Sequence, residues 1–556
     1  MQVVIPMSGF GERFRAAGYT VPKPLIPVDG KPIIAHVVDL FPGETDFTFI
    51  CNQDHLADPA LGMEAILRGL CPGARIVPIA PHRLGPVHAA LQAAPFLDPA
   101  RPVLVNYCDF ACYWDWDDFR RFVAETGCAG AIPAYRGFHP HSLGSTFYAY
   151  LWEKDGWVSG IQEKQPWTGT PMNEYASSGA YYFATAALMQ DAFEAALAEN
   201  WTTGGEYYAS MAYNHLFARG LPVAVYPLQH FMQWGTPADL REYLRWSAAF
   251  RRLAEPAQPP PEHPGMVLVP MAGLGRRFSD RGYILPKPLV PVSGRPMVVQ
   301  AANDLPRARR RRFVLRQDLP HLAEVSDALL REVPGGETAT LDALTDGQAR
   351  TCVEGLADAA IDPDTPLTIG ACDNGMLYDS ARLAALLDDA NCDVLVWAVR
   401  GHPEAVRHPR MFGWLQADAE GRITGVSVKV PLDDPARDPI VTGAFTFRRT
   451  RDFLAACDRM FARGARVNGE FYVDTAIEDA LALGLRCRLF EVDHYLGWGT
   501  PDDLAIFEYW QSCFHKWPSH PYRLERDGRV PADAVPALDA RYAAIRPQRP
   551  APEAAP

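Results

Sequence analysis

Residues 5–14 read IPMSGFGERF, and residues 22–25 read PKPL. A short apolar run leads into a Gly-x-Gly-x-Arg loop, and a lysine then stands between two prolines. The glycines let backbone N–H groups approach an anion closely, and the arginine adds a planar, permanent charge that suits phosphate. The prolines stiffen the segment that presents the lysine ammonium. The stretch predicts a triphosphate-binding loop after a buried strand.

The same pattern occurs a second time, as VPMAGLGRRF at 269–278 and PKPL at 286–289. The shift between the copies is constant: 287 − 23 = 264 for the lysines and 373 − 109 = 264 for two Cys-Asp pairs. The string WGTP recurs at 234–237 and 498–501. A single Gly-x-Gly is more often a tight turn, but one shift held this far predicts a duplicated domain.

Domain borders follow from composition. We expect a first domain over 1–253, a Pro-rich linker over 254–264, a second domain over 265–516 and a Pro/Ala-rich tail over 517–556. The linker holds the run QPPPEHP at 258–264, which should be extended and semi-rigid.

Each copy alternates apolar runs with amphipathic stretches, which predicts an α/β fold with a mostly parallel mixed sheet flanked by helices. The expected strands of the first copy are 3–6, 47–51, 76–79, 103–105 and 129–133, and the expected helices are 33–40, 87–94 and 116–126. Such sheets bind ligands beyond the carboxyl ends of their strands.

Composition excludes several classes of protein. The 556 residues carry a net charge of 53 − 66 = −13, which argues against a nucleic-acid partner. The hydrophobic fraction of 48% is that of a folded chain. No apolar run is long enough for a membrane span and no export signal is seen, so we expect a cytoplasmic enzyme. The eleven cysteines form no C-x-x-C pair and are expected to be reduced and mostly buried.

An aspartate follows an apolar strand in each copy, at Asp109 and Asp373. Mg²⁺ usually keeps several waters and takes one or two protein carboxylates, so a carboxylate beside a phosphate loop predicts a Mg²⁺ site. The alternative for such a residue is a turn or helix cap.

Each copy resembles the sugar-phosphate nucleotidylyltransferase family, over about 1–250 and 265–512. The resemblance implies two tandem Rossmann-like nucleotidyltransferase domains. It implies that the loop arginines stabilise the departing pyrophosphate, that the lysines stabilise the α-phosphate, and that the two aspartates hold Mg²⁺. The catalytic residues implied in these loops are Arg13, Lys23, Arg277 and Lys287, and the nucleotide-binding residues are Gly9, Gly11, Gly85, Gly273 and Gly275.

The resemblance also implies an acceptor site at residues 161–166, which read IQEKQP. Glu163 would bind acceptor hydroxyl groups and Lys164 the acceptor phosphate. Neighbouring side chains on a strand point to opposite faces, so sharing one pocket requires a bulge or bend. A solvated edge strand is the alternative. Further acceptor-binding candidates are Gly179, Glu206, Gly443 and Glu470.

The second copy departs from this pattern. Lys429 matches Lys164, whereas Val428 stands where Glu163 does. We therefore expect the second pocket to keep its contact with the acceptor phosphate and to lose its hydroxyl acceptor. It would take a different acceptor or no longer turn over. Many family members also supply a second metal carboxylate at positions held here by Gln233 and Gly497.

The function expected from the resemblance is Mg²⁺-dependent transfer from an NTP to a sugar phosphate or similar phosphorylated small molecule, with release of pyrophosphate. The chain would be bifunctional and could form a homo-oligomer, and a role in surface polysaccharide precursors would follow from the family. Three other functions stay open: one active domain with a degenerate regulatory copy, a CTP-dependent cytidylyltransferase for a phospho-alcohol or phosphonate, and a GT-A-like glycosyltransferase. The last would use the Asp-Trp-Asp string at 115–117. A scaffold without chemistry would not explain two complete phosphate loops, and neither copy has the Walker pattern.

Overall fold

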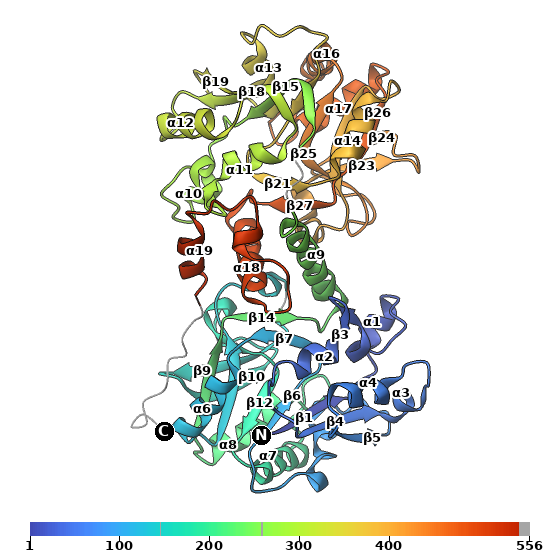
Figure 1. Cartoon of the computed structure of the whole chain (residues 1–556), viewed down its shortest axis with the longest axis vertical. Helices are drawn as coiled ribbons and strands as arrows, with labels where there is room; N and C mark the ends of the chain where they lie inside the picture. The colour runs from blue at the N-terminus through green and yellow to red at the C-terminus, as the bar shows by residue number, and fades with distance from the viewer. Residues whose placement is uncertain (145, 257–259, 544–556) are drawn as a thin grey trace. The chain divides into compact units, whose positions relative to one another are not determined.

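The computed structural model describes residues 1–144, 146–256 and 260–543 (Figure 1). The chain divides into two compact units. Unit 1 comprises Met1–Ser247 with Lys516–Pro518 and Ala543, and unit 2 comprises Ala248–His515 with Ser519–Tyr542. Positions 257–259 of the expected linker and 544–556 of the expected tail lie outside the described residues.

Unit 1 is built on one mixed sheet with the strand order β5-β4-β1-β6-β12-β8-β13-β10-β9-β11. Its strands are β1 (Gln2–Met7), β4 (Phe47–Asn52), β5 (Arg75–Ile79), β6 (Val103–Asn106), β8 (Gly130–Tyr135), β9 (Ala149–Lys154), β10 (Trp157–Glu163), β11 (Tyr175–Ser177), β12 (Ala180–Phe183) and β13 (Val223–Leu228). Two small ribbons, β2 (Pro27–Val28) with β3 (Lys31–Pro32) and β7 (Phe110–Tyr113) with β14 (His230–Gln233), complete it.

The helices of unit 1 are α1 (Glu12–Ala16), α2 (Ile33–Val38), α3 (Gln53–Ala57), α4 (Met63–Leu70), α5 (Pro86–Leu91), α6 (Trp116–Thr126), α7 (Ala186–Ala198) and α8 (Ala209–Ala218). Helix α9 (Pro237–Leu253) begins in unit 1 and ends beyond its border at Ser247. Helices α5, α7 and α8 cover one face, where Val4, Val105 and Ile132 form the core with Phe193 and Leu216. Because β1, β4, β6 and β8 are buried along their length, their sequences are almost continuously apolar.

Unit 2 repeats the strand order, as β19-β18-β15-β20-β25-β22-β26, with the hairpin β23–β24 joined to β25. Its strands are β15 (Glu262–Pro270), β16 (Pro291–Val292), β17 (Arg295–Pro296), β18 (Arg307–Arg316), β19 (Gly336–Leu341), β20 (Leu367–Ile369), β21 (Asn374–Leu377), β22 (Val394–Val399), β23 (Gly413–Ala417), β24 (Ile423–Val428), β25 (Ile440–Phe447), β26 (Cys487–Glu491) and β27 (His494–Gly497). Its helices are α10 (Arg276–Ser279), α11 (Met297–Asp304), α12 (Leu322–Glu332), α13 (Gln348–Leu356), α14 (Ser380–Asp388), α15 (Pro403–Arg407), α16 (Thr450–Ala462), α17 (Val473–Ala482), α18 (Pro501–Lys516) and α19 (Val535–Arg541).

The predicted α/β fold is confirmed, and each expected strand and helix of the first copy is present. The sheet carries more antiparallel pairing than the sequence suggested. β12 runs antiparallel between β6 and β8, and the hairpin β9–β10 adds antiparallel strands at one side. Short apolar runs do not reveal strand direction, because a buried strand of either direction reads alike.

Residues 519–542 of the expected tail are packed structure of unit 2. Tyr522 is fully buried, and its hydroxyl donates to Asp527 Oδ2 at 2.9 Å. Gln511 Nε2 donates to the Tyr522 hydroxyl at 2.8 Å, and the Tyr542 hydroxyl donates to Gln511 Oε1 at 2.9 Å. The first residues of β15 likewise lie within the expected linker, since this strand begins at Glu262. Proline-rich composition obscured these anchored segments.

Two expectations from composition can be compared with the structure. Within the described residues, no helix combines the length and apolar character needed to cross a membrane. The eleven cysteines form no disulfide, and ten of them are buried.

Candidate functional site

The first phosphate loop connects β1 to α1. Gly11 caps α1 with φ 63°, a backbone conformation that favours glycine. A Cβ at Gly11 would lie 3.8 Å from the backbone nitrogen of Lys23, so the loop packs against the segment that carries the lysine. Gly275 has φ 61°, and a Cβ there would lie 3.3 Å from Cβ of Lys287. Both copies therefore place glycine and lysine side by side.

The lysine of each loop forms an ion pair with an aspartate, which follows β6 in unit 1 and β20 in unit 2. Lys23 Nζ lies 2.8 Å from Asp109 Oδ2, and each side chain is about a quarter exposed. Lys287 Nζ lies 2.5 Å from Asp373 Oδ2 and donates to the Gly499 carbonyl at 2.9 Å. Burial lowers the pKa of Lys23, but the charge and hydrogen bond of Asp109 outweigh it and the pKa is raised. The lysine is a permanent cation at neutral pH.

The WGTP strings explain how each aspartate is positioned. The Trp234 amide donates to the Asp109 carbonyl at 3.0 Å, and a Cβ at Gly235 would lie 3.0 Å from both Asp109 Oδ2 and Gln233 Nε2. The Gln233 amide thus lies beside the carboxylate where many family members have a second acid. Gly499 has the same relation to Asp373, at 3.2 Å. The repeated string was the signal for these glycines, whose role the sequence did not reveal.

Arg13 lies in α1, and its charge acts on groups of both the loop and the predicted acceptor side. Burial and the Asp109 charge are the main influences on the pKa of Lys23, and the positive charge of Arg13 opposes its protonation. Burial and Glu206 raise the pKa of Tyr208, and Arg13 opposes this rise. In unit 2, the charge of Arg277 likewise acts to lower the pKa of Lys287 and of Tyr472. The guanidinium is therefore close enough to influence both sides of the site.

Glu163 and Lys164 lie at a bend of the chain, as a shared pocket would require. Lys164 has φ 60°, which turns the chain directly after β10. Lys164 Nζ donates to the Tyr208 hydroxyl at 2.7 Å, and the Ser210 hydroxyl donates to Glu163 Oε2 at 2.6 Å. Both side chains thus reach the start of α8, although they are neighbours on a strand. The Tyr208 hydroxyl also donates to Glu206.

Gly85 brings the loop before α5 against the segment that holds these residues. A Cβ at Gly85 would lie 2.8 Å from the Tyr207 nitrogen, and Tyr207 exchanges backbone hydrogen bonds with Leu84 and Val87. A side chain at this position would separate the two segments. Gly85 therefore has a structural reason to be glycine, and its contact with a nucleotide stays a prediction.

Gly179 acts through Tyr107. The Tyr107 amide donates to the Gly179 carbonyl at 3.0 Å, and a Cβ at Gly179 would lie 3.0 Å from the Tyr107 ring. The Tyr107 hydroxyl in turn accepts from the Ala209 amide at 3.1 Å, at the start of α8. Gly443 has φ 84° and would place a Cβ 3.2 Å from that of Ala371. The acceptor contacts expected of Gly179 and Gly443 stay predictions.

Unit 2 keeps the lysine of the acceptor side. Lys429 has φ 63°, donates to the Met411 carbonyl, and lies 5.5 Å from the centre of the Tyr472 ring. Burial raises the pKa of Tyr472 to about 12 and Glu470 adds to the rise, as Glu206 does for Tyr208. Lysine, tyrosine and glutamate thus recur, with Val428 at the end of β24.

The donor set fits a metal that needs few protein ligands. Within the described ranges, no group of three or more His, Cys, Asp or Glu side chains could hold a metal by itself. Asp109 supplies one partly exposed carboxylate beside the phosphate loop. One carboxylate, phosphate oxygens and waters together suit Mg²⁺.

The Asp-Trp-Asp string has structural roles. Asp115 caps α6 by accepting from the Asp118 amide at 2.9 Å, Asp117 pairs with Arg120 at 2.5 Å, and Trp116 is buried. These contacts do not support a glycosyltransferase metal motif.

Comparisons with known proteins agree with this geometry. Residues 3–163 match the model of the MobA-like NTP transferase domain. The first unit carries a nucleotidyltransferase domain. The matched residues of this nucleotidyltransferase domain run from β1 to Glu163, at the end of β10, and so include the phosphate loop, Lys23 and Asp109.

The chain is also 34% identical over 109 residues to the bifunctional protein GlmU of Paraburkholderia phytofirmans and of Burkholderia orbicola. These alignments cover 20% of this chain and 22% of each relative, so the chain matches about a fifth of their length. A solved nucleoside-diphosphate-sugar pyrophosphorylase from Vibrio cholerae RC9 aligns with 44% of this chain and 99% of its own, at 20% identity and a TM-score of 0.36. An inositol-1-phosphate CTP transferase from T. maritima aligns with 45% of this chain and 96% of its own, at 13% identity and a TM-score of 0.36.

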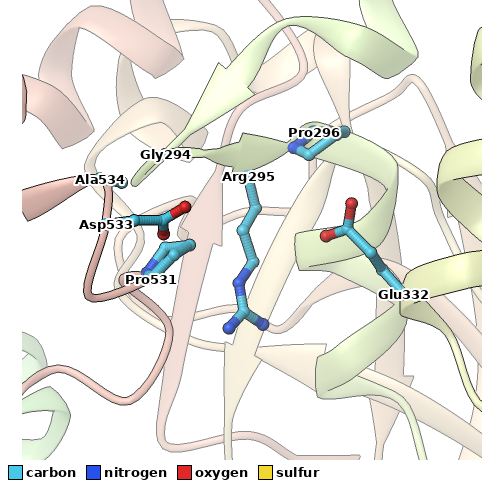
Figure 2. A pocket seen from close by; sticks show the side chains of 7 residues that line it. All are labelled: Gly294, Arg295, Pro296, Glu332, Pro531, Asp533 and Ala534. Carbon is cyan, nitrogen blue, oxygen red and sulfur yellow. The ribbon is translucent and has the colours of Figure 1, made fainter.

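A separate pocket of about 490 Å³ lies in unit 2 (Figure 2). Arg295 lies in it, with Asp533 and Glu332 at its walls. None of the predicted site residues lines this pocket, so it belongs to neither nucleotide loop.

Proposed function

We propose that unit 1 is a Mg²⁺-dependent nucleotidyltransferase that joins an NTP to a sugar phosphate or similar phosphorylated small molecule and releases pyrophosphate. The observation that carries the proposal is the Lys23–Asp109 pair at the phosphate loop, on the same matched domain as the Glu163–Lys164 acceptor side. A nucleotide and a phosphorylated acceptor need these two kinds of site together.

The reaction joins an acceptor phosphate oxygen to the α-phosphorus of the NTP. The bond from this phosphorus to the bridging oxygen breaks, and pyrophosphate leaves with the bonding electrons. Lys164 would hold the acceptor phosphate, and Lys23 with Arg13 would neutralise charge on the NTP phosphates. Mg²⁺ bound at Asp109 would neutralise further phosphate charge. Positioning and electrostatics carry such transfers, so no covalent enzyme intermediate is required.

We extend the proposal to unit 2, which would make the chain bifunctional. Lys287 and Asp373 form the same pair as Lys23 and Asp109, and Lys429 has the same backbone bend as Lys164. The observed strand order is also the same in both units. A copy kept only for structure would not need to retain the ion pair of the phosphate loop.

The test is a factorial assay on the full chain. Pyrophosphate release is measured with each of the four common NTPs, CTP included, against a panel of phosphorylated acceptors. Four proteins are compared: wild type, Asp109→Ala, Asp373→Ala and the double variant. We expect each single variant to lose one nucleotide–acceptor combination and the double variant to lose all. Undiminished release by the double variant, with its melting temperature unchanged, would refute the proposal.

A further inference from the structure

The hairpins β9–β10 and β23–β24 have matching registers. Glu163 pairs with Ala149 in unit 1, and Val428 pairs with Gly413 in unit 2. Directly after each strand comes the lysine with positive φ. The Lys164 amide donates to the Tyr148 carbonyl, and the Lys429 amide donates to the Phe412 carbonyl. The structure therefore confirms independently of sequence alignment that Val428 occupies the position of Glu163.

The residue that contacts Glu163 also differs between the two units, where unit 2 gains a carboxylate instead of losing one. In unit 1 the Ser210 hydroxyl, in the first turn of α8, donates to Glu163. The equivalent residue in unit 2 is Asp474 (474 − 210 = 264), in the first turn of α17. Unit 1 thus has a carboxylate on the strand and a hydroxyl on the helix. Unit 2 has valine on the strand and a carboxylate on the helix.

A third substitution makes room for this carboxylate. A Cβ at Gly413 would lie much closer than 3.0 Å to Asp474 Oδ2. Real Cβ atoms essentially never approach another heavy atom so closely. Ala149 stands at this position in unit 1, where no carboxylate comes from the helix. The Asp474 carboxylate therefore lies directly over β23, beside the end of β24.

The carboxylate is coupled to the lysine of the same pocket. Burial raises the pKa of Asp474 to about 6, and the charge of Lys429 opposes the rise. Burial lowers the pKa of Lys429, and the charges of Asp474 and Glu470 oppose this, while Arg277 adds to it. The charges of Asp474 and Lys429 thus act on each other, and both side chains are half-buried.

We infer that Asp474 is the acceptor-binding carboxylate of unit 2 and determines its acceptor specificity. It would accept hydrogen bonds from a hydroxyl group of a phosphorylated acceptor whose phosphate binds Lys429. The inference rests on the proposed function of unit 2. Because aspartate is one methylene shorter than glutamate and comes from the helix, it meets the acceptor from another direction, and the two units select different acceptors.

The test uses the full chain with unit 1 silenced by Lys23→Ala and Asp109→Ala. Pyrophosphate release by unit 2 is measured against hexose 1-phosphates, inositol 1-phosphate, glycerol phosphates, phosphocholine and inorganic phosphate. Binding of each Mg²⁺–NTP is measured by calorimetry. In this background we expect Asp474→Asn to lower kcat/KM for the acceptor by about 10- to 100-fold, as for a lost hydrogen bond to a charged group, with NTP binding unchanged.

A rescue variant separates binding from folding. Asp474→Ser with Val428→Glu and Gly413→Ala rebuilds the arrangement of unit 1, and we expect it to restore turnover and shift preference toward the acceptor of unit 1. Asp479→Asn is the matched control on α17, because buried Asp479 pairs with Arg463 at 2.8 Å. It should lower the melting temperature without raising the acceptor KM.

The outcomes distinguish the inference from the function on which it rests. If unit 2 turns over and Asp474→Asn keeps the wild-type acceptor KM and kcat, the inference is wrong and the proposed function stands. If unit 2 binds Mg²⁺–NTP but turns over with no hydroxyl-bearing acceptor, the inference is also wrong. If unit 2 neither binds an NTP nor turns over, its proposed function fails first.

Discussion

Lys23 Nζ lies 2.8 Å from Asp109 Oδ2. The cation that we propose to bind the nucleotide phosphates and the carboxylate that we propose to bind Mg²⁺ thus neutralise each other. The pair keeps both groups in place and avoids an uncompensated charge in a partly buried site. Under the proposed function, Mg²⁺–NTP would provide each of them with a new partner of opposite charge.

Replacing Lys23 should reduce catalysis far more than stability. We expect Lys23→Met to lower kcat of unit 1 by about 10²- to 10³-fold, the usual cost of removing one group that stabilises transition-state charge. Single-turnover pyrophosphate release with the unit 1 substrates measures this. Lys31→Met is the control, because the partly exposed Lys31–Asp39 pair is expected to contribute little. Equal rates in the two variants would contradict the role of Lys23.

Gly235→Ala should displace the Asp109 carboxylate. The added Cβ would lie 3.0 Å from Asp109 Oδ2 and from Gln233 Nε2, so one of these groups must move. We expect the Mg²⁺ concentration for half-maximal activity to rise about tenfold, because second-sphere changes typically cost at least this much. The control is Gly169→Ala, since a Cβ there meets nothing within 4 Å. An unchanged Mg²⁺ dependence would show that the position of Asp109 is unimportant.

Glu163 should make unit 1 sensitive to mild acid. Burial raises its pKa, with Glu206 adding to the rise and Ser210 and Lys164 opposing it. Acceptor kcat/KM should therefore fall at a higher pH than the ordinary glutamate pKa of about 4.3, and the Glu163→Gln profile should lack this limb. A pH profile of unit 1, with unit 2 silenced by Asp373→Ala, measures both.

The same pKa shift has a consequence for stability. A raised folded-state pKa means that the unfolded chain releases its proton first as pH rises, so the free energy of unfolding falls above about pH 4.3. Glu163→Gln should thus raise the melting temperature at neutral pH and have a smaller effect below that pH. A stabilisation that is equal at both pH values would contradict the shift.

Residues 519–542 should be essential for the stability of unit 2. Tyr522→Phe removes a fully buried hydroxyl that joins Gln511 to Asp527, and leaving these partners unsatisfied should cost about 1–3 kcal/mol. Thermal or urea unfolding of the full chain measures this cost. Tyr283→Phe is the control, because Tyr283 is 37% exposed. Equal stability of the two variants would support a loosely held tail.

The conformation of the two glycine loops was predictable because it depends on local residues. Gly11 has a positive φ, Lys23 follows it on the same stretch of chain between two prolines, and Asp109 comes shortly after the mostly apolar strand β6. Local backbone requirements restrict which residues can stand at a position, and the duplication repeats the same residues in the second copy. The pairing of Lys23 with Asp109 follows once the parallel strands β1 and β6 are neighbours.

The acceptor side depended on contacts that sequence spacing does not show. Ser210 meets Glu163 across 47 positions, and Tyr208 meets Lys164 across 44. From the sequence alone, Val428 therefore indicated that the second acceptor site had lost a carboxylate. Only the fold revealed that Asp474 lies over Gly413 at the same place.

The sequence by itself determined which residues repeat, where the phosphate loops lie and which α/β elements surround them, because these depend on neighbours along the chain. The tertiary structure decided strand direction, the packing of residues 519–542 and the position of the Asp474 carboxylate beside Gly413. A pocket needs charge at a point in space, and folding can bring that charge from a strand or from a helix.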